Sequence, residues 1–302
     1  MKHFKTISEF HEFRNLPKPQ HPLFSVINVA EVRHLHNDEP MPMAMDFYSI
    51  AIKRMSNAMV KYGQQPFDFN EGIMSFMAPK QVFSIGLNNK NESIKQSGWV
   101  MYIHPDFLWN TTLAKTIRGY EFWSYSLHEA LFLSEKEETV VNNIIQNINQ
   151  EYHSNIDKFS KQIIISQIES LLNYADRFYH RQFITREKAA HQVLERLEKI
   201  VSDYFNSDDL MSSGLPSVQY IAEQVYLSPK YLSSLLRVLT GQNTQQYIHA
   251  KLIEKAKEKL STTDLTVSEI AYELGFEHLQ SFSKLFKAKT NLSPLKFRES
   301  FN

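Results

Sequence analysis

The sequence contains no cysteine, and glycine is scarce, with 8 residues in a chain of 302. The absence of thiols excludes disulfides, thiolate zinc sites and cysteine nucleophiles. It is typical of proteins that work in the cytoplasm, where we expect this chain. With so few glycines, a glycine-rich loop that holds a phosphate group has few places to form.

Long hydrophobic runs and an excess of one charge are also missing. No apolar stretch approaches the roughly 18 residues of a membrane-spanning helix, and the N-terminal segment is too polar for a secretory signal. Lys+Arg and Asp+Glu both number 33, so the whole chain has no net charge that attracts nucleic acids. Residues 217–302 differ slightly, with 11 basic and 8 acidic side chains. We expect no membrane partner.

Short segments rich in aromatic, methionine and branched side chains fill residues 21–125, with glycine and proline in the breaks. Many short strands at this spacing predict a β-barrel or sandwich. From Ser134 the pattern changes, because Ser134 and Glu137 can form a capping box and two amphipathic helices follow, to about residue 180. The helix pair can pack on the strands or form a dimer interface, and the sequence favours neither.

One helical pattern occurs twice near the C-terminus. Val218, Ile221, Ala222 and Val225 recur 49 residues later as Val267, Ile270, Ala271 and Leu274, and Leu232, Leu235 and Leu236 recur 50 residues later as Phe282, Leu285 and Phe286. Each copy has a short turn between two helical stretches, which is typical of a helix-turn-helix unit. We predict two such units, at about 217–241 and 266–291, joined by a linker helix at about 244–260.

The outward positions of the second helix in each unit lack acids. If the repeated apolar residues face a core, the outward or flanking residues are Lys230, Tyr231, Ser233, Ser234 and Arg237 in the first copy, and His278, Gln280, Ser281, Lys284 and Lys287 in the second. Gln can read adenine, Ser can bond bases or phosphates, and Lys and Arg can bind guanine or phosphate. A linker of about 25 Å would hold the two helices near one turn of B-DNA apart, about 34 Å. The sequence therefore predicts double-stranded DNA as a partner.

The stretch TVSEIAYELGFEHLQSFSKLF, residues 266–286, carries a more specific pattern, I-A-x-x-x-G-F-x-x-x-x-x-F-x-x-x-F-K followed by P-x-x-[YF]-R. Its positions are Ile270, Ala271, Gly275, Phe276, Phe282, Phe286, Lys287, Pro294, Phe297 and Arg298. Residues 217–300 thus resemble the DNA-binding domain of the AraC/XylS family of bacterial transcription regulators.

The resemblance implies which residues contact DNA. Base or backbone contacts fall on Lys230, Ser233, Ser234 and Arg237 in the first unit, and on Gln280, Ser281, Lys284 and Lys287 in the second. The first unit departs from the family, because Ser233 and Ser234 stand where many members carry longer polar or basic side chains. This departure favours phosphate contacts over base reading for the first helix.

The resemblance also implies an α+β chain with two domains. A cupin-like barrel or sandwich with the helix pair, at 1–185, would sense a small molecule or form a homodimer, and an all-α DNA-binding domain would occupy 186–302. Residues 66–81, PFDFNEGIMSFMAPKQ, resemble a turn found in such barrels. The expected function is a transcription regulator, for which the family favours activation, and an activator would also contact RNA polymerase.

A metal site in the first domain has little support. His34, His36 and Glu39 have the spacing H-x-H-x-x-E, and on a strand the two imidazoles would share a face and could bind a metal. No glycine-framed motif surrounds them, and His104, before Pro105, is the only candidate to complete the set. We interpret the segment as a solvated loop and predict no metal, no cofactor and no catalytic residues, since motifs such as GxSxG and HExxH are missing.

Two alternatives to a ligand-responsive regulator stay open: a metal-dependent cupin enzyme with an accessory DNA-binding domain, and a regulator whose empty barrel is tuned by dimerisation or another protein. Rings in the strand region can stack a sugar or an apolar acid, although core packing needs the same rings. They are Phe47, Tyr48, Phe67, Phe69, Phe76, Phe83, Trp99 and Tyr102.

Overall fold

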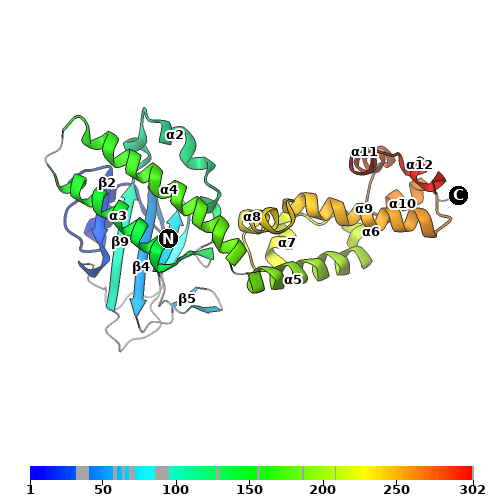
Figure 1. Cartoon of the computed structure of the whole chain (residues 1–302), viewed down its shortest axis with the longest axis horizontal. Helices are drawn as coiled ribbons and strands as arrows, with labels where there is room; N and C mark the ends of the chain where they lie inside the picture. The colour runs from blue at the N-terminus through cyan, green and yellow to red at the C-terminus, as the bar shows by residue number, and fades with distance from the viewer. Residues whose placement is uncertain are drawn as a thin grey trace. The chain divides into compact units, whose positions relative to one another are not determined.

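The structure is a computed structural model of the chain (Figure 1). It describes residues 1–31, 41–56, 60–62, 65–67, 72–85, 95–126, 129–154, 157–185, 187–207 and 209–300. The chain divides into two compact units, Met1–Gln182 and Phe183–Asn302. Each unit has a hydrophobic core of its own. Within the described residues, no helix is long and apolar enough to cross a membrane.

The N-terminal unit contains a five-stranded antiparallel sheet in the order β10-β7-β4-β9-β2. These strands are β2 (Phe24–Asn28), β4 (Tyr48–Ser56), β7 (Gly72–Met77), β9 (Lys95–Ile103) and β10 (Leu131–Leu133). A three-stranded sheet contains β1 (Lys2–Phe4), β3 (Met41–Met45) and β8 (Phe83–Ile85), and β5 (Val60–Tyr62) pairs with β6 (Gln65–Phe67).

A common core lies between the two larger sheets. Phe4 and Met43 from the three-stranded sheet belong to the same buried cluster as Ala51 and Tyr102 from the five-stranded sheet. Phe10 of helix α1 (Ile7–Phe13) joins them, with its ring centroid 5.0 Å from that of Tyr102. The N-terminal unit is therefore a mixed α+β sandwich, as the sequence predicts.

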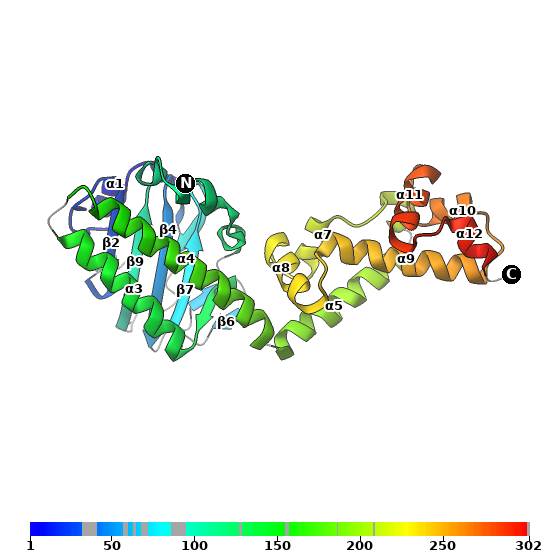
Figure 2. The ribbon, with the colours of Figure 1, turned by 45° about the horizontal axis from the view of Figure 1, so that its top comes forward.

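Two long helices, α3 (Glu135–His153) and α4 (Ser160–Thr185), lie across the five-stranded sheet (Figures 1 and 2). The capping box predicted at the start of α3 is present, with Ser134 accepting from the Glu137 backbone amide. The ring of Tyr152 contacts Phe24 of β2, with a centroid separation of 5.6 Å. The packing interpretation of the helix pair is thus confirmed, and a role in dimerisation stays a prediction.

After β9 ends at Ile103, the next described strand is β10 at Leu131–Leu133, so the predicted strand region from about 21 to 125 is wrong in its last part. Helical turns follow: η2 (Pro105–Leu108), α2 (Thr112–Thr116), η3 (Ile117–Gly119) and η4 (Glu121–Ser124), while η1 (Val29–Glu31) follows β2. Pro105 starts η2 because its missing N–H is not needed there, and the His104 side chain accepts from the Asp106 amide. The Thr111 side chain caps α2 in the same way.

The C-terminal unit is entirely helical in its described part. Its helices are α5 (Glu187–Asn206), α6 (Asp209–Ser213), α7 (Val218–Gln224), α8 (Pro229–Thr240), α9 (Thr244–Thr262), α10 (Val267–Glu273), α11 (Leu279–Thr290) and α12 (Pro294–Glu299). The predicted helix-turn-helix pairs are α7–α8 and α10–α11. The predicted linker is α9, which ends at Thr262, two residues later than expected.

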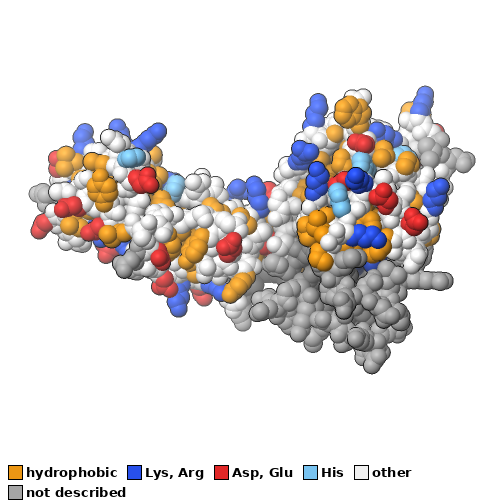
Figure 3. Space-filling model, turned by 180° about the vertical axis from the view of Figure 1, so that it is seen from behind, with side chains coloured by type: hydrophobic (Ala, Val, Ile, Leu, Met, Phe, Trp, Pro, Cys, Tyr) orange, Lys and Arg blue, Asp and Glu red, His pale blue; other side chains and the backbone are white. Residues whose placement is uncertain are grey.

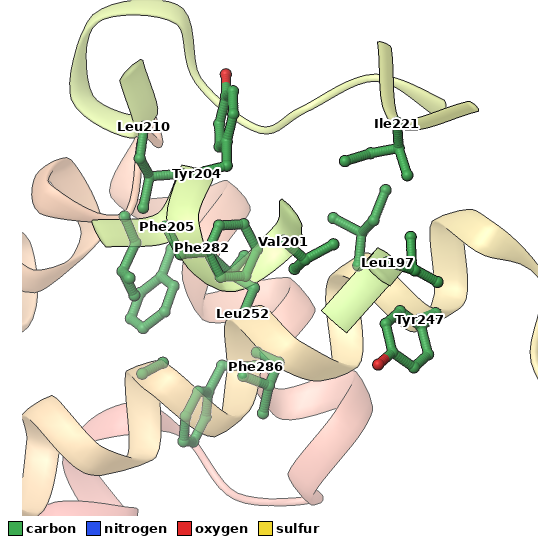
Figure 4. Packing of buried hydrophobic residues seen from close by; sticks show 14 of the residues in the cluster. Leu197, Val201, Tyr204, Phe205, Leu210, Ile221, Tyr247, Leu252, Phe282 and Phe286 are labelled. Atoms are coloured by element: carbon green, nitrogen blue, oxygen red, sulfur yellow. The ribbon is translucent and has the colours of Figure 1, made fainter. Parts of the chain in front are cut away.

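Helix α9 forms the centre of this unit. Leu252 and Ala256 in its middle are fully buried, in the same cluster as Leu197 of α5. Phe282 and Phe286 of α11 are fully buried there as well, and Figure 4 labels Leu252, Phe282 and Phe286 in this core. Burial of a Phe side chain contributes about 1.5–3 kcal/mol, so these contacts fix α11 on α9.

Gly275, after α10, has no room for a side chain. Its φ of +77° lies in the left-handed region, and a Cβ atom there would lie 2.4 Å from the carbonyl oxygen of Leu210. The Cβ would also lie 3.0 Å from the Cα atom of Gly214. Both neighbours are backbone atoms, which cannot rotate away, so glycine is required for two independent reasons.

We predict that Gly275→Ala destabilises the C-terminal unit by about 2–4 kcal/mol, through left-handed strain and the backbone clash. Gly241→Ala is the matched control, because Gly241 has a φ of +74° and nothing within 4 Å of the added Cβ. Gly241→Ala should lower the free energy of unfolding by only about 1 kcal/mol.

Urea unfolding followed by far-ultraviolet circular dichroism measures the loss of stability in both variants. All three tryptophans precede residue 183, so their fluorescence should show an unchanged N-terminal transition. Equal losses in both variants would contradict the clash.

Candidate nucleic-acid interface

The duplication visible in the sequence is also present in the backbone hydrogen bonds. Leu227 N–H donates to the Ala222 carbonyl at 3.0 Å, and Phe276 N–H donates to the Ala271 carbonyl at 3.0 Å. These two pairs lie 49 residues apart and close the two turns in the same way. The turns therefore set the same relation between the helices of each unit.

Both turns use a left-handed residue at the equivalent position. In the second copy it is Gly275, and in the first it is Tyr226, with a φ of 60°. The Tyr226 side chain is 72% exposed, and the guanidinium carbon of Arg196 lies 4.8 Å from its ring centroid. Helix α7 ends at Gln224, since the left-handed conformation at Tyr226 terminates it.

The repeat continues beyond the second helix of each unit. The hydroxyls of Thr240 and Thr290 donate to the carbonyls of Leu236 and Phe286, both at 2.8 Å. Each threonine is followed by a left-handed residue, and the next helix is capped by a side chain, Asn243 for α9 and Ser293 for α12. Helix α12 therefore corresponds to the start of α9, and each copy contains three helices.

The outward face of α11 is as the sequence predicts. His278, Gln280, Ser281, Lys284 and Lys287 are all exposed, whereas Phe282 and Phe286 are fully buried. Gln280, Lys284 and Lys287 follow the i, i+4, i+7 spacing of one helix face, and α11 contains no acidic residue. In Figure 3 basic side chains gather along the upper edge of the C-terminal unit, where Figure 1 places α11.

The outward face of α8 differs from the prediction. Lys230 and Arg237 are exposed, Tyr231 and Ser233 are half-buried, and Ser234 is only 5% exposed. The expectation that Ser234 faces outward is therefore wrong. The sequence pattern identifies the core stripe of leucines correctly, but it cannot reveal a second covered strip on the opposite side of a helix.

Lysines, rather than His249, supply the positive charge around α11. Burial lowers the pKa of His249 on α9, and the nearby charge of Lys289 lowers it further. His249 is therefore mostly neutral at pH 7. Lys289 is an exposed cation on α11, which contains no acidic residue, and Lys296 is an exposed cation on α12. Sequence reasoning missed both lysines.

Arg298 and Glu273 form contacts with α9 inside this unit and are not part of the outward face of α11. The Arg298 Nε atom donates to the Leu260 carbonyl at 3.1 Å, near the C-terminal end of α9, where a positive charge is favoured. Lys259 of α9 and Glu273 of α10 form an ion pair at 2.7 Å. Glu269 accepts from the backbone of Thr266, and these bonds hold the pKa of its carboxyl below the usual value.

The candidate sites of the N-terminal unit are only partly within the described residues. His34, His36, Glu39 and Phe69 lie outside them, as does part of the turn at 66–81, and the side chain of Phe67 is not described. Buried aromatic rings pack on one another, as Tyr48 does on Trp123 with centroids 4.7 Å apart. Within the described part of the chain, no group of three or more His, Asp or Glu residues could hold a metal ion.

Comparison with known proteins places residues 221–300 in the family described as "Helix-turn-helix domain". An uncharacterized HTH-type transcriptional regulator of Staphylococcus aureus is 28% identical over 148 residues, which are 48% of this chain and 18% of that protein. The uncharacterized HTH-type transcriptional regulator YijO of Escherichia coli is 26% identical over 159 residues, which are 53% of this chain and 52% of that protein. The chain thus spans less than a fifth of the length of the Staphylococcus protein.

Among solved structures, the C-terminal domain of the two-component response regulator yesN from Fusobacterium nucleatum is 29% identical. The match covers 35% of this chain and 98% of that one, with a TM-score of 0.31.

We predict that Lys287→Ala and Arg237→Ala each reduce the salt dependence of binding to duplex DNA, because each removes about one phosphate contact. The slope of log K against log salt concentration should fall by about 0.9 for each variant. Fluorescence anisotropy of the full-length protein over a salt series measures this slope. Lys199→Ala is the control, since Lys199 is an exposed lysine on α5, and its slope should match the wild type. Equal slopes in all four proteins would contradict the interface.

Proposed function

We propose that this chain is a sequence-specific transcription regulator of the AraC type, since residues 221–300 match the model of a helix-turn-helix domain. The observation that carries the proposal is the acid-free exposed face of α11, with Gln280, Ser281, Lys284 and Lys287. These side chains suit the donors and acceptors at base edges and the negative phosphates beside them. Double-stranded DNA is the partner that this chemistry fits.

Helix α9 sets the distance between the two units in the proposed mechanism. It contains 19 residues, which gives a length of about 28 Å at 1.5 Å per residue. Successive major-groove segments on one face of B-DNA lie about 34 Å apart. In the proposed complex, α8 and α11 therefore meet neighbouring turns of one duplex, while α9 stays outside the grooves.

The N-terminal unit is proposed to sense a small molecule, to form a homodimer, or both. A core separate from that of the DNA-binding unit supports a sensing role, because the unit can then respond to a ligand without repacking the other core. Helix α4 and the residue before it expose apolar side chains, with Phe159 58% and Ile163 43% exposed, which supports a contact with a second copy. We propose activation, with RNA polymerase as a further partner, a cytoplasmic location and no catalytic activity.

Selection from a pool of random duplex DNA tests the regulator function. We expect the full-length protein to enrich one motif that persists as the salt concentration rises, because contacts to bases depend less on salt than contacts to phosphates. Two copies of the motif in one site would support a dimer.

Residues 183–302 alone provide the control for an effector requirement. Enrichment by this unit but not by the full chain would mean that the N-terminal unit needs its ligand. If neither protein enriches a motif, the proposal of sequence-specific regulation is wrong.

A further inference from the structure

The repeat allows α8 and α11 to be compared position by position. At an offset of 50 residues, Tyr231, Ser234 and Val238 of α8 correspond to Ser281, Lys284 and Ala288 of α11. Spacings of three and four residues place each set along one strip of its helix. The strip on α11 is exposed at all three positions, whereas on α8 Ser234 is buried and the other two residues are half-buried.

In the α8 strip, Tyr231 packs against Phe183, which is the first residue of the C-terminal unit and lies in the last turn of α4. The two rings meet edge to face, with centroids 5.0 Å apart. Phe183 itself is only 2% exposed. Tyr231 and Val238 are also larger and more apolar than their counterparts on α11. Their chemistry suits contact with protein rather than with base edges.

Ser233 is held by the linker helix. Its hydroxyl lies 3.0 Å from the hydroxyl of Thr244, the fully buried first residue of α9. The equivalent of Thr244 in the second copy is Pro294, which has no hydroxyl. The bond is therefore specific to the first unit, and it occupies part of the hydrogen-bonding capacity of the half-buried Ser233 hydroxyl.

Of the five outward or flanking residues predicted in the first unit, only Lys230 and Arg237 are exposed. We infer that α8 holds DNA by phosphate contacts through these two cations, and that base recognition falls on α11, through Gln280, Ser281 and Lys284. This division rests on the proposed function, since it assigns roles within a DNA complex.

The exposed groups of α11 are suited to base reading. A Gln amide can make two hydrogen bonds to adenine, a Lys can donate to guanine, and a Ser hydroxyl can bond either type of edge. Gln280 and Ser281 lie in the first turn of α11, and in helix-turn-helix complexes the N-terminal residues of the second helix contact the base edges. Arg237, by contrast, lies in the last turn of α8. Lys230 lies in the first turn of α8, but its neighbours Tyr231, Ser233 and Ser234 are half-buried or buried, which favours a phosphate contact for Lys230.

Three matched pairs of variants test the division in the full-length protein: Lys230→Ala with Gln280→Ala, Ser234→Ala with Lys284→Ala, and Arg237→Ala with Lys287→Ala. The probes are the duplex enriched by the wild type and all its single-base variants. The readout is the ratio of each dissociation constant to that of the enriched duplex, which separates loss of specificity from uniform loss of affinity. Circular dichroism confirms that each variant is folded.

For the α8 variants, we expect every ratio to stay within about twofold of wild type, although Lys230→Ala and Arg237→Ala weaken all duplexes together. For Gln280→Ala or Lys284→Ala, we expect a preference of about tenfold to a hundredfold at one or two base pairs to disappear. A loss of preference in an α8 variant, or unchanged preferences in both Gln280→Ala and Lys284→Ala, would overturn the division. A wild type with no preference at all would instead refute the proposed function.

Phe183→Ala tests whether Phe183 only packs against α8 or covers a face of α8 that can contact bases. If the α8 strip only packs against protein, this variant keeps the wild-type motif and unfolds at a lower temperature. If Phe183 instead covers a base-reading face, the variant acquires a second short motif beside the first. That result would overturn the assignment of base recognition to α11 alone.

Discussion

The packing of both repeats against α9 is the constraint on which the C-terminal unit depends. Its buried side chains, with Leu252 at the centre, contribute to one core that contains residues of both copies, including Ile221 of α7 and Phe286 of α11. A rigid helix that both units share fixes their separation and orientation through apolar contacts. Two helix-turn-helix units joined by a flexible segment would not hold their second helices at a defined spacing.

Similar backbone geometry in the two copies does not give them similar surfaces. The hydrogen bonds that start the turns and the ends of the second helices recur at offsets of 49 and 50 residues, yet the outward side of α8 is partly covered and that of α11 is exposed. The difference begins with a few side chains, such as Tyr231 in place of Ser281 and Thr244 in place of Pro294. A duplicated scaffold can thus provide one surface for holding a duplex and another for reading its sequence.

The local features of the C-terminal unit could be predicted because they depend on neighbouring residues. Capping by Ser217 and Thr266, and the core stripes of α8 and α11, follow from periodicity and side-chain chemistry alone. The burial of Ser234 depends on distant residues that the helix pattern does not reveal. In the N-terminal unit, β1 was missed because a three-residue strand acquires its structure from its partners, as Phe4 does in the core between the sheets. Helix α1 was also missed, although Thr6 and Glu9 form a capping box at its start.

The central claim is that one chain contacts two neighbouring turns of DNA but reads sequence in only one of them. Hydroxyl-radical cleavage and guanine methylation of the same bound duplex, with the full-length protein and a selected site, test both halves together. The account predicts two protected backbone segments about one helical turn apart, on one face of the duplex. It predicts protected bases in only one segment. A single protected segment, or protected bases in both, would contradict it.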